Sequence, residues 1–156
     1  METNDTIWLI TGDLGFGLFD NIRDDFPERF LNAGAAEQTM MDIAVGLALE
    51  GKIPFVYSIT PFLLYRPFET IRTYINHEKI PVKMVGSGRD QDYEHDGYSH
   101  NASDVKKLFA TWNEGGLCEG IFNHIEYYFP GETEQIPAAL DEIVQNKKPV
   151  FLSLKR

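Results

Sequence analysis

The strongest constraint on the fold is a regular alternation of short apolar runs with longer segments of helical periodicity. The short runs are rich in β-branched and aromatic residues, which is typical of strands buried inside a sheet. Strands are predicted over Ile7–Thr11, Phe30–Asn32, Phe55–Ser58, Val82–Gly86, Gly120–Asn123 and Val150–Leu154. Strands that alternate with helices predict a three-layer α/β/α domain with a mostly parallel central sheet.

Helices are expected between these strands. They are predicted over Asp20–Asp25, Gln38–Glu50, Pro67–Asn76, Ser103–Trp112 and Glu134–Gln145. The second is apolar almost all round and should be buried. The longest stretch without a regular pattern is Ser87–Ala102, a polar loop that follows a strand. Loops of this length are usually functional or disordered, and ligand sites in open α/β sheets gather beyond the carboxyl ends of strands.

Composition and charge exclude several classes of protein. A chain of 156 residues fits one compact domain, and its net charge of −10 disfavours binding to nucleic acid or to anionic lipid. The only cysteine, Cys118, leaves no internal disulfide to form. The first residues lack the pattern of a signal peptide, and no apolar run approaches the ~20 residues that span a bilayer. We therefore expect a soluble cytoplasmic protein.

A glycine-rich segment follows the first predicted strand, at Gly12–Gly17. A loop of this kind can bring backbone N–H groups close to a phosphate. The segment lacks the GxGxxG spacing of a dinucleotide fingerprint, and no Gly-Lys-Ser/Thr follows as in a P-loop. On its own it is weak support for a phosphate site.

Glu37 stands at the head of the buried helix. An acidic residue there can simply stabilise the helix dipole. The residues before it, at 33–36, are all alanine or glycine and leave room for a ligand to approach. Phe62 follows another strand beside a proline and is the best candidate for stacking on a flat ring, an interaction of about 0.5–1.5 kcal/mol beyond area burial.

The polar loop contains the sequence Asp96-Gly97-Tyr98-Ser99-His100. An aspartate and a histidine in one loop can position and protonate a polar substrate. Glu94 and His95 precede them, but a contiguous cluster lacks the rigid spacing of a metal site, so no metal is expected here. A solvated loop is the commonest alternative for such residues.

Four segments taken together resemble the pyrimidine-binding domain of transketolase and of deoxyxylulose-phosphate synthase. They are GDLG at 12–15, the segment 26–56 around AEQ, PVKMVGSG at 81–88 and EHDGYSHNASD at 94–104. The ending PVFLSLKR at 149–156 is also similar to the close of that domain. The resemblance covers nearly the whole chain and implies a single domain, 1–156, with the thiamine-diphosphate-binding fold.

The resemblance implies a cofactor, thiamine diphosphate, bound between two similar domains. Glu37 corresponds to the glutamate that activates the cofactor through a pyrimidine ring nitrogen, and Phe62 to an aromatic residue that packs on that ring. Asp13 and Tyr65 correspond to further cofactor-binding positions. One departure is Ile59, which stands where the family often has a second aromatic residue.

The resemblance also implies substrate contacts by Asp96, His100 and Arg66, with His100 assisting proton transfer. Here the family's usual Asp-Gly-Pro-Thr-His becomes Asp-Gly-Tyr-Ser-His, so Tyr98 replaces a rigid proline. The reaction implied is two-carbon (ketol or acyl) transfer to or from a small molecule.

No Gly-Asp-Gly followed by a distant asparagine occurs in the sequence. We therefore expect a partner subunit to supply the diphosphate-binding domain and to hold Mg²⁺ or Ca²⁺, in a split enzyme that forms a homodimer or a heterotetramer. Two alternatives are a subunit of a 2-oxo-acid decarboxylase and a non-catalytic subunit that retains the fold. A flavodoxin-like regulator unrelated to thiamine is a third.

Overall fold

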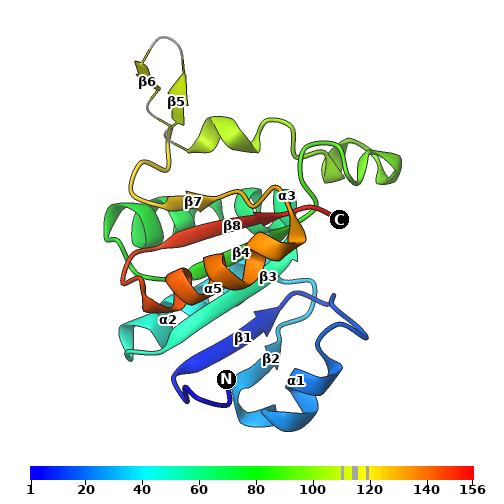
Figure 1. Cartoon of the computed structure of the whole chain (residues 1–156), viewed down its shortest axis with the longest axis vertical. Helices are drawn as coiled ribbons and strands as arrows, with labels where there is room; N and C mark the ends of the chain where they lie inside the picture. Colours follow the sequence, from blue (N-terminus) through cyan, green and yellow to red (C-terminus); the bar gives the residue numbers. More distant parts are fainter. Residues whose placement is uncertain (110, 114–115, 119) are drawn as a thin grey trace.

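The computed structural model describes residues 1–109, 111–113, 116–118 and 120–156. In this part of the chain six parallel strands form one sheet in the order β2-β1-β3-β4-β8-β7 (Figure 1). The strands are β1 (Ile7–Thr11), β2 (Phe30–Asn32), β3 (Ile53–Ile59), β4 (Lys83–Ser87), β7 (Glu126–Tyr128) and β8 (Val150–Leu154). A separate antiparallel pair joins β5 (Thr111–Asn113) to β6 (Gly116–Cys118).

Helices cover both faces of this sheet. They are α1 (Asp20–Asp25), α2 (Glu37–Leu49), α3 (Thr60–Tyr65), α4 (Phe68–Thr70), the π-helix η2 (Ile71–His77) and α5 (Ile136–Gln145). Helices α2, α3 and η2 pack on one face, and α5 lies across the other in front of β3 and β4 (Figure 1). The fold is therefore the predicted three-layer α/β/α arrangement.

The alternation of side chains along β3 shows how the sheet builds two cores. Val56 points to the face covered by α2 and α3, where it joins a fully buried cluster with Met40 and Leu63. Phe55 and Tyr57 point to the opposite face and pack against the cluster that includes Ile143 of α5. Successive side chains on a strand alternate between faces, so one apolar strand serves both layers.

The strand predicted over Gly120–Asn123 is wrong. The structure forms the edge strand later, as β7, and within the predicted segment only Phe122 makes an isolated bridge, with Phe109. Phe122 is fully buried in the core, whereas Tyr127 of β7 stacks on Phe151 of β8 with ring centroids 5.5 Å apart. Tertiary packing of these aromatic rings therefore selected a less apolar segment for the edge.

One helix prediction is wrong. The segment Ser103–Trp112 forms a short 3-10 turn at Val105–Leu108, and its residues 111–112 belong to β5, while residue 110 lies outside the described part. The helix predicted over Pro67–Asn76 is observed as α4 and η2, with Pro67 as the N-cap of α4. The preceding helix α3 was not predicted, although Pro61 lies in its first turn, where proline is favoured.

Further 3-10 turns lie at η1 (Pro27–Arg29), η3 (Glu94–Asp96), η4 (Tyr98–His100) and η6 (Thr133–Gln135). The turns η3 and η4 give local order to the polar loop that the sequence predicted after β4. Within the described residues, no helix has the length and the hydrophobicity needed to cross a membrane.

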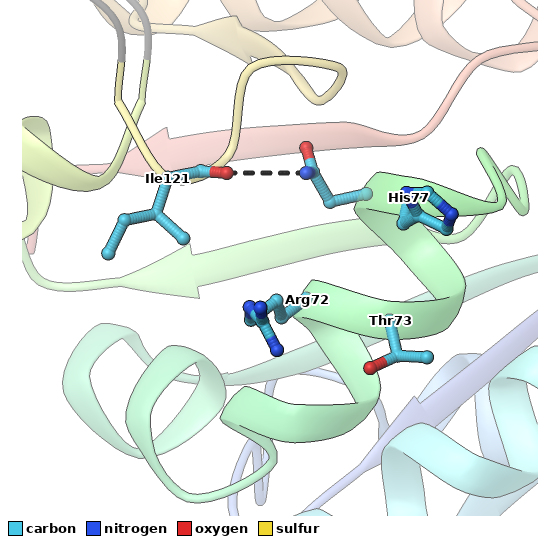
Figure 2. A pocket seen from close by; sticks show the side chains of 5 residues that line it. Arg72, Thr73, His77 and Ile121 are labelled. Atoms are coloured by element: carbon cyan, nitrogen blue, oxygen red, sulfur yellow. Dashed lines mark hydrogen bonds between the residues drawn. The ribbon is translucent and has the colours of Figure 1, made fainter.

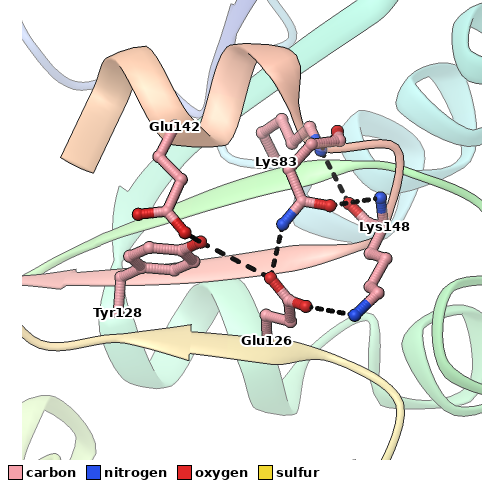
Figure 3. Close-up of polar contacts among 6 residues, drawn as sticks. Lys83, Glu126, Tyr128, Glu142 and Lys148 are labelled. Atoms are coloured by element: carbon pink, nitrogen blue, oxygen red, sulfur yellow. Dashed lines mark hydrogen bonds and ion pairs between the residues drawn. The ribbon is translucent and has the colours of Figure 1, made fainter. Parts of the chain in front are cut away.

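A polar network surrounds Lys83 at the amino ends of β4, β7 and β8 (Figure 3). Lys83 is almost fully buried, and its Nζ donates to the backbone carbonyl oxygens of Asn146 and Lys148 at 2.5 and 2.6 Å. Burial lowers the pKa of the Lys83 ammonium to about 8, against a smaller opposing effect of Glu126. Glu126 itself is bonded to Lys148 and Asn146, which lower the pKa of its carboxyl group.

This network predicts a pH-dependent stability. The pKa of Lys83 is lower in the folded than in the unfolded chain, so the unfolded chain binds more protons between about pH 8 and the ordinary lysine range. The free energy of unfolding of the wild type relative to Lys83→Met should therefore rise with pH across that window, by about 2 kcal/mol. Urea denaturation at several pH values measures it. Lys147→Met, at an exposed neighbouring lysine, is the control, and a pH-independent difference for Lys83→Met would contradict the prediction.

Candidate functional site

The side chains of interest follow successive strands at one edge of the sheet. Glu37 comes after β2, Phe62 and Arg66 after β3, and His100 after β4. Since these strands are parallel members of one sheet, their carboxyl ends lie at the same edge (Figure 1). We call Glu37, Phe62, Arg66 and His100 the edge cluster.

Glu37 is the most buried member of the edge cluster. It is the first residue of α2 and only 4% exposed, and its Oε1 accepts a hydrogen bond from Arg66 Nη1 at 2.7 Å. The N-terminus of a helix also favours negative charge. An isolated buried carboxylate would be unstable, so the ion pair and the helix together explain how Glu37 is accommodated.

Phe62 lies between Arg66, which binds Glu37, and His100. The Arg66 guanidinium carbon lies 3.7 Å from the centroid of the Phe62 ring, and the His100 ring meets Phe62 edge-on with centroids 4.8 Å apart. His100 Nδ1 is 3.1 Å from Ser99 Oγ. The structure therefore brings together four of the residues singled out from sequence, in the order Glu37, Arg66, Phe62, His100.

Close packing of α3 on β4 holds Phe62 at this edge. Thr60, the first residue of α3, donates to the Ser87 carbonyl oxygen at 3.1 Å. A Cβ on Gly86 would lie 2.5 Å from Thr60 Oγ1 and 2.8 Å from the Phe151 ring. Only a glycine at position 86 permits this approach.

Tyr65 faces the loop rather than the edge cluster. Its hydroxyl group donates to Asp104 Oδ1 at 2.7 Å, which ties the end of α3 to the segment after His100. Burial, with a smaller contribution from Asp104, raises the pKa of the Tyr65 hydroxyl group. The observed contact is thus one between two protein segments, and cofactor binding by Tyr65 stays a prediction.

Asp13 lies just beyond β1 with a left-handed backbone (φ 56°) and an exposed side chain. Its backbone N–H donates to Asn32 Oδ1 at 3.0 Å, and the same oxygen accepts from Gly34 N–H at 2.9 Å. Asn32 therefore fixes the loops after β1 and β2, a role that sequence reasoning missed. The signal was an asparagine at a strand end, where its side chain can bond to nearby backbone.

Asp96 is not in contact with the edge cluster. It lies on η3 with a half-exposed side chain, and its Oδ2 is 3.3 Å from His95 Nε2. Asp96 and His100 thus have different partners in this structure, and substrate binding by either residue stays a prediction.

Sequence reasoning also missed Arg89, which is almost fully buried beyond β4. Its Nη2 donates to the Pro130 and Ser153 carbonyl groups, and the guanidinium carbon lies 3.7 Å from the Phe129 ring centroid. Burial lowers the pKa of this guanidinium group. Through these contacts Arg89 holds the start of the polar loop against β8 and against the segment after β7.

Two buried hydroxyl groups lie near the carboxyl ends of β1 and β3. Thr11 Oγ1 and Ser58 Oγ have no hydrogen-bond partner among the described residues. Between them and α2, a Cβ on Gly12 would lie 3.4 Å from Met40 Sδ and 3.7 Å from Ser58 Oγ. Two hydroxyl groups with unused hydrogen-bonding capacity thus lie close to the edge at which Glu37 begins α2. In the described ranges no group of three or more acidic, histidine or cysteine residues could hold a metal ion.

A separate pocket of about 420 Å³ lies beside the π-helix η2 (Figure 2). Arg72, Thr73, Asn76 and His77 from η2 line it together with Ile121, whose carbonyl oxygen accepts from Asn76 Nδ2 at 3.2 Å. None of these residues belongs to the edge cluster, so this pocket is distinct from the candidate site.

The fold and the edge cluster define a parallel α/β domain with a carboxylate and an aromatic ring at the carboxyl edge of its sheet. The family described as "Transketolase, pyrimidine binding domain" matches residues 1–156. The chain therefore belongs to this family.

Two curated relatives are similar to the chain. It is 45% identical over 133 residues to the "Putative transketolase C-terminal section" of Methanocaldococcus jannaschii, covering 85% of this chain and 39% of the relative. It is 31% identical over 130 residues to the "6-deoxy-6-sulfo-D-fructose transketolase subunit SqwH" of Clostridium sp. (strain MSTE9), covering 83% and 37%. The chain thus spans less than half the length of these relatives.

One solved structure is similar over almost the whole chain. The "Split gene transketolase, inactive beta4 tetramer" matches with a TM-score of 0.81 and 28% identity, covering 99% of this chain and 47% of the other. The predicted resemblance and the predicted fold are thereby confirmed.

The contact between α3 and the loop predicts a local effect. Tyr65→Phe removes the hydrogen bond to Asp104 and should speed hydrogen exchange of backbone amides at 98–104, while costing about 0.5–1.5 kcal/mol of stability. Hydrogen-exchange mass spectrometry measures this. Tyr74→Phe, at an exposed tyrosine of η2, is the control. Equal exchange in the two variants would show that the bond does not order the loop.

Proposed function

We propose that this chain is the pyrimidine-binding part of a thiamine-diphosphate-dependent, transketolase-like enzyme that transfers two-carbon (ketol or acyl) units. The observation that carries the proposal is the meeting of buried Glu37 with Phe62 and His100 at the carboxyl edge, in a chain of the transketolase pyrimidine-binding family. The names of the relatives, which are transketolase sections and subunits, support the reaction class.

When bound, thiamine diphosphate supplies an electron sink for an acyl carbanion. Glu37 shares a proton with a nitrogen of the pyrimidine ring and so holds the ring in its reactive tautomer. Its burial supports this role, because a hydrogen bond to a carboxylate is stronger where water is excluded. The buried hydroxyl group of Ser58, which has no hydrogen-bond partner among the described residues, supports a polar ligand near α2.

Phe62 provides the flat surface on which the ring stacks, and His100 acts on the substrate. Ser99 engages His100 Nδ1, which leaves Nε2 to bond with a substrate hydroxyl group and to move its proton. Substrate binding by Arg66 and Asp96, and cofactor binding by Asp13 and Tyr65, remain parts of the proposal that rest on the resemblance.

The proposal includes a partner subunit that holds the diphosphate group through Mg²⁺ or Ca²⁺. The similar proteins support it. The chain spans less than half of two curated relatives named as a transketolase section and a transketolase subunit, and the similar solved structure is titled "Split gene transketolase, inactive beta4 tetramer". Heteromeric assembly is therefore expected for activity.

Co-purification tests the proposal directly. The tagged chain should retain a stoichiometric partner together with thiamine diphosphate, and the complex should transfer two-carbon units from a ketose. Release of CO₂ from a 2-oxo acid without transfer would assign a decarboxylase instead. A homo-oligomer that binds no thiamine diphosphate, with or without added Mg²⁺, would contradict the proposal and favour a non-catalytic subunit.

Replacing the buried carboxylate should abolish turnover. Glu37→Gln keeps the size of the side chain but removes the proton-sharing carboxylate, so we expect the reconstituted complex to lose at least about 100-fold in kcat. The fold should persist, as judged by circular dichroism. Glu50→Gln, at the exposed opposite end of α2, is the control and should retain full activity. Near-wild-type turnover of Glu37→Gln would refute the role of Glu37.

Removing the stacking ring should mainly affect cofactor affinity. Phe62→Ala should weaken thiamine diphosphate binding about fivefold, since stacking contributes roughly 1 kcal/mol, while kcat at saturating cofactor falls less. Isothermal titration calorimetry of the complex measures the dissociation constant. Tyr74→Ala, at an exposed aromatic side chain, is the control. An unchanged dissociation constant for Phe62→Ala would contradict stacking on Phe62.

A further inference from the structure

Arg66 contacts both Glu37 and Phe62, the two residues that hold the pyrimidine ring in the proposed function. Its Nη1 donates to Glu37 Oε1 at 2.7 Å while its guanidinium carbon lies 3.7 Å from the Phe62 ring centroid. One planar group thus bonds to the carboxylate and covers the aromatic ring at the same time.

The guanidinium group of Arg66 is chemically similar to the aminopyrimidine ring whose binding it would exclude. Both are flat, present N–H groups in their own plane, stack on an aromatic face and donate to a carboxylate. A ring that reaches Glu37 Oε1 and Phe62 together must enter the space from which Arg66 reaches them. The ring and the guanidinium group therefore cannot hold these contacts simultaneously.

Arg66 is also placed so that it can leave. It is the C-terminal cap of α3, and its side chain is 47% exposed, whereas that of Glu37 is 4% exposed. The guanidinium group is therefore the outer cover of a buried carboxylate. Because the Arg66 side chain itself is half-exposed, its guanidinium group can return to water when a ligand takes its place at Glu37.

We propose that Arg66 is an internal placeholder in the pyrimidine site: it occupies Glu37 and Phe62 in the cofactor-free chain and swings into solvent when the ring binds. This inference rests on the proposed function, because it concerns the same site. It assigns Arg66 a different role from the substrate contact predicted from sequence. In this role Arg66 compensates the buried charge of Glu37 until the ring binds.

The test measures how tightly the site binds the isolated ring. The full chain, alone and with its co-purified partner, is titrated with 4-amino-5-hydroxymethyl-2-methylpyrimidine and followed by NMR, for the wild type, Arg66→Ala and Arg72→Ala. Arg72 is an exposed arginine of η2 and serves as the matched control. Arg66→Ala should bind the ring about tenfold more tightly than the wild type, and Arg72→Ala should bind like the wild type.

A competition experiment gives a second readout. Guanidinium ion, added at concentrations too low to unfold the chain, should weaken ring binding to Arg66→Ala, because it refills the vacated space. It should affect the wild type less. The melting temperature of Arg66→Ala without ligand should fall, since Glu37 loses its partner, and should recover on adding the ring.

The outcomes separate the two proposals. Ring binding to Arg66→Ala that equals or is weaker than wild-type binding would overturn the placeholder and leave the proposed function standing. Weaker binding would mean that Arg66 contacts the ring directly. Failure of every variant to bind the ring, together with failure of the complex to bind thiamine diphosphate and Mg²⁺, would overturn both.

Discussion

The placement of one charge, that of Glu37, organises this edge of the molecule. Its carboxylate is buried at the start of α2, where the helix N-terminus and the Arg66 guanidinium group together offset the loss of water. Arg66 in turn lies on Phe62, and Phe62 meets His100. The four side chains therefore form a continuous series of contacts from the start of α2 to the polar loop.

The parallel sheet is what makes this arrangement possible. The edge cluster comes from three segments, which follow β2, β3 and β4, and the strand order β2-β1-β3-β4 brings the ends of these strands to one edge. The close contact that Gly86 allows between β4 and α3 then sets the height of Phe62 above the sheet. At the opposite edge, the Lys83 network joins β4 to the turn before β8.

Sequence reasoning succeeded where local pattern and tertiary packing agree. The bounds of β1, β2, β8 and α1 were predicted as they are observed, and Glu37 was identified from its place before an apolar helix. It failed at Gly120–Asn123, whose apolar residues serve the core as an irregular segment. It also failed at Ser103–Trp112, where helical spacing did not lead to an α-helix. In both cases the outcome depended on which aromatic rings pack together, and periodicity within one segment does not contain that information.

The sequence by itself determined the class of fold, the family resemblance and the identity of the candidate site residues, because these depend on residue order and local pattern. Only the tertiary structure decided which candidates meet. It joined Glu37, Arg66, Phe62 and His100, and it directed Tyr65 to Asp104 and Asp96 to His95. The physical reason is that side-chain contacts across 29 or 39 positions are fixed by strand order and helix packing, not by neighbours in the chain.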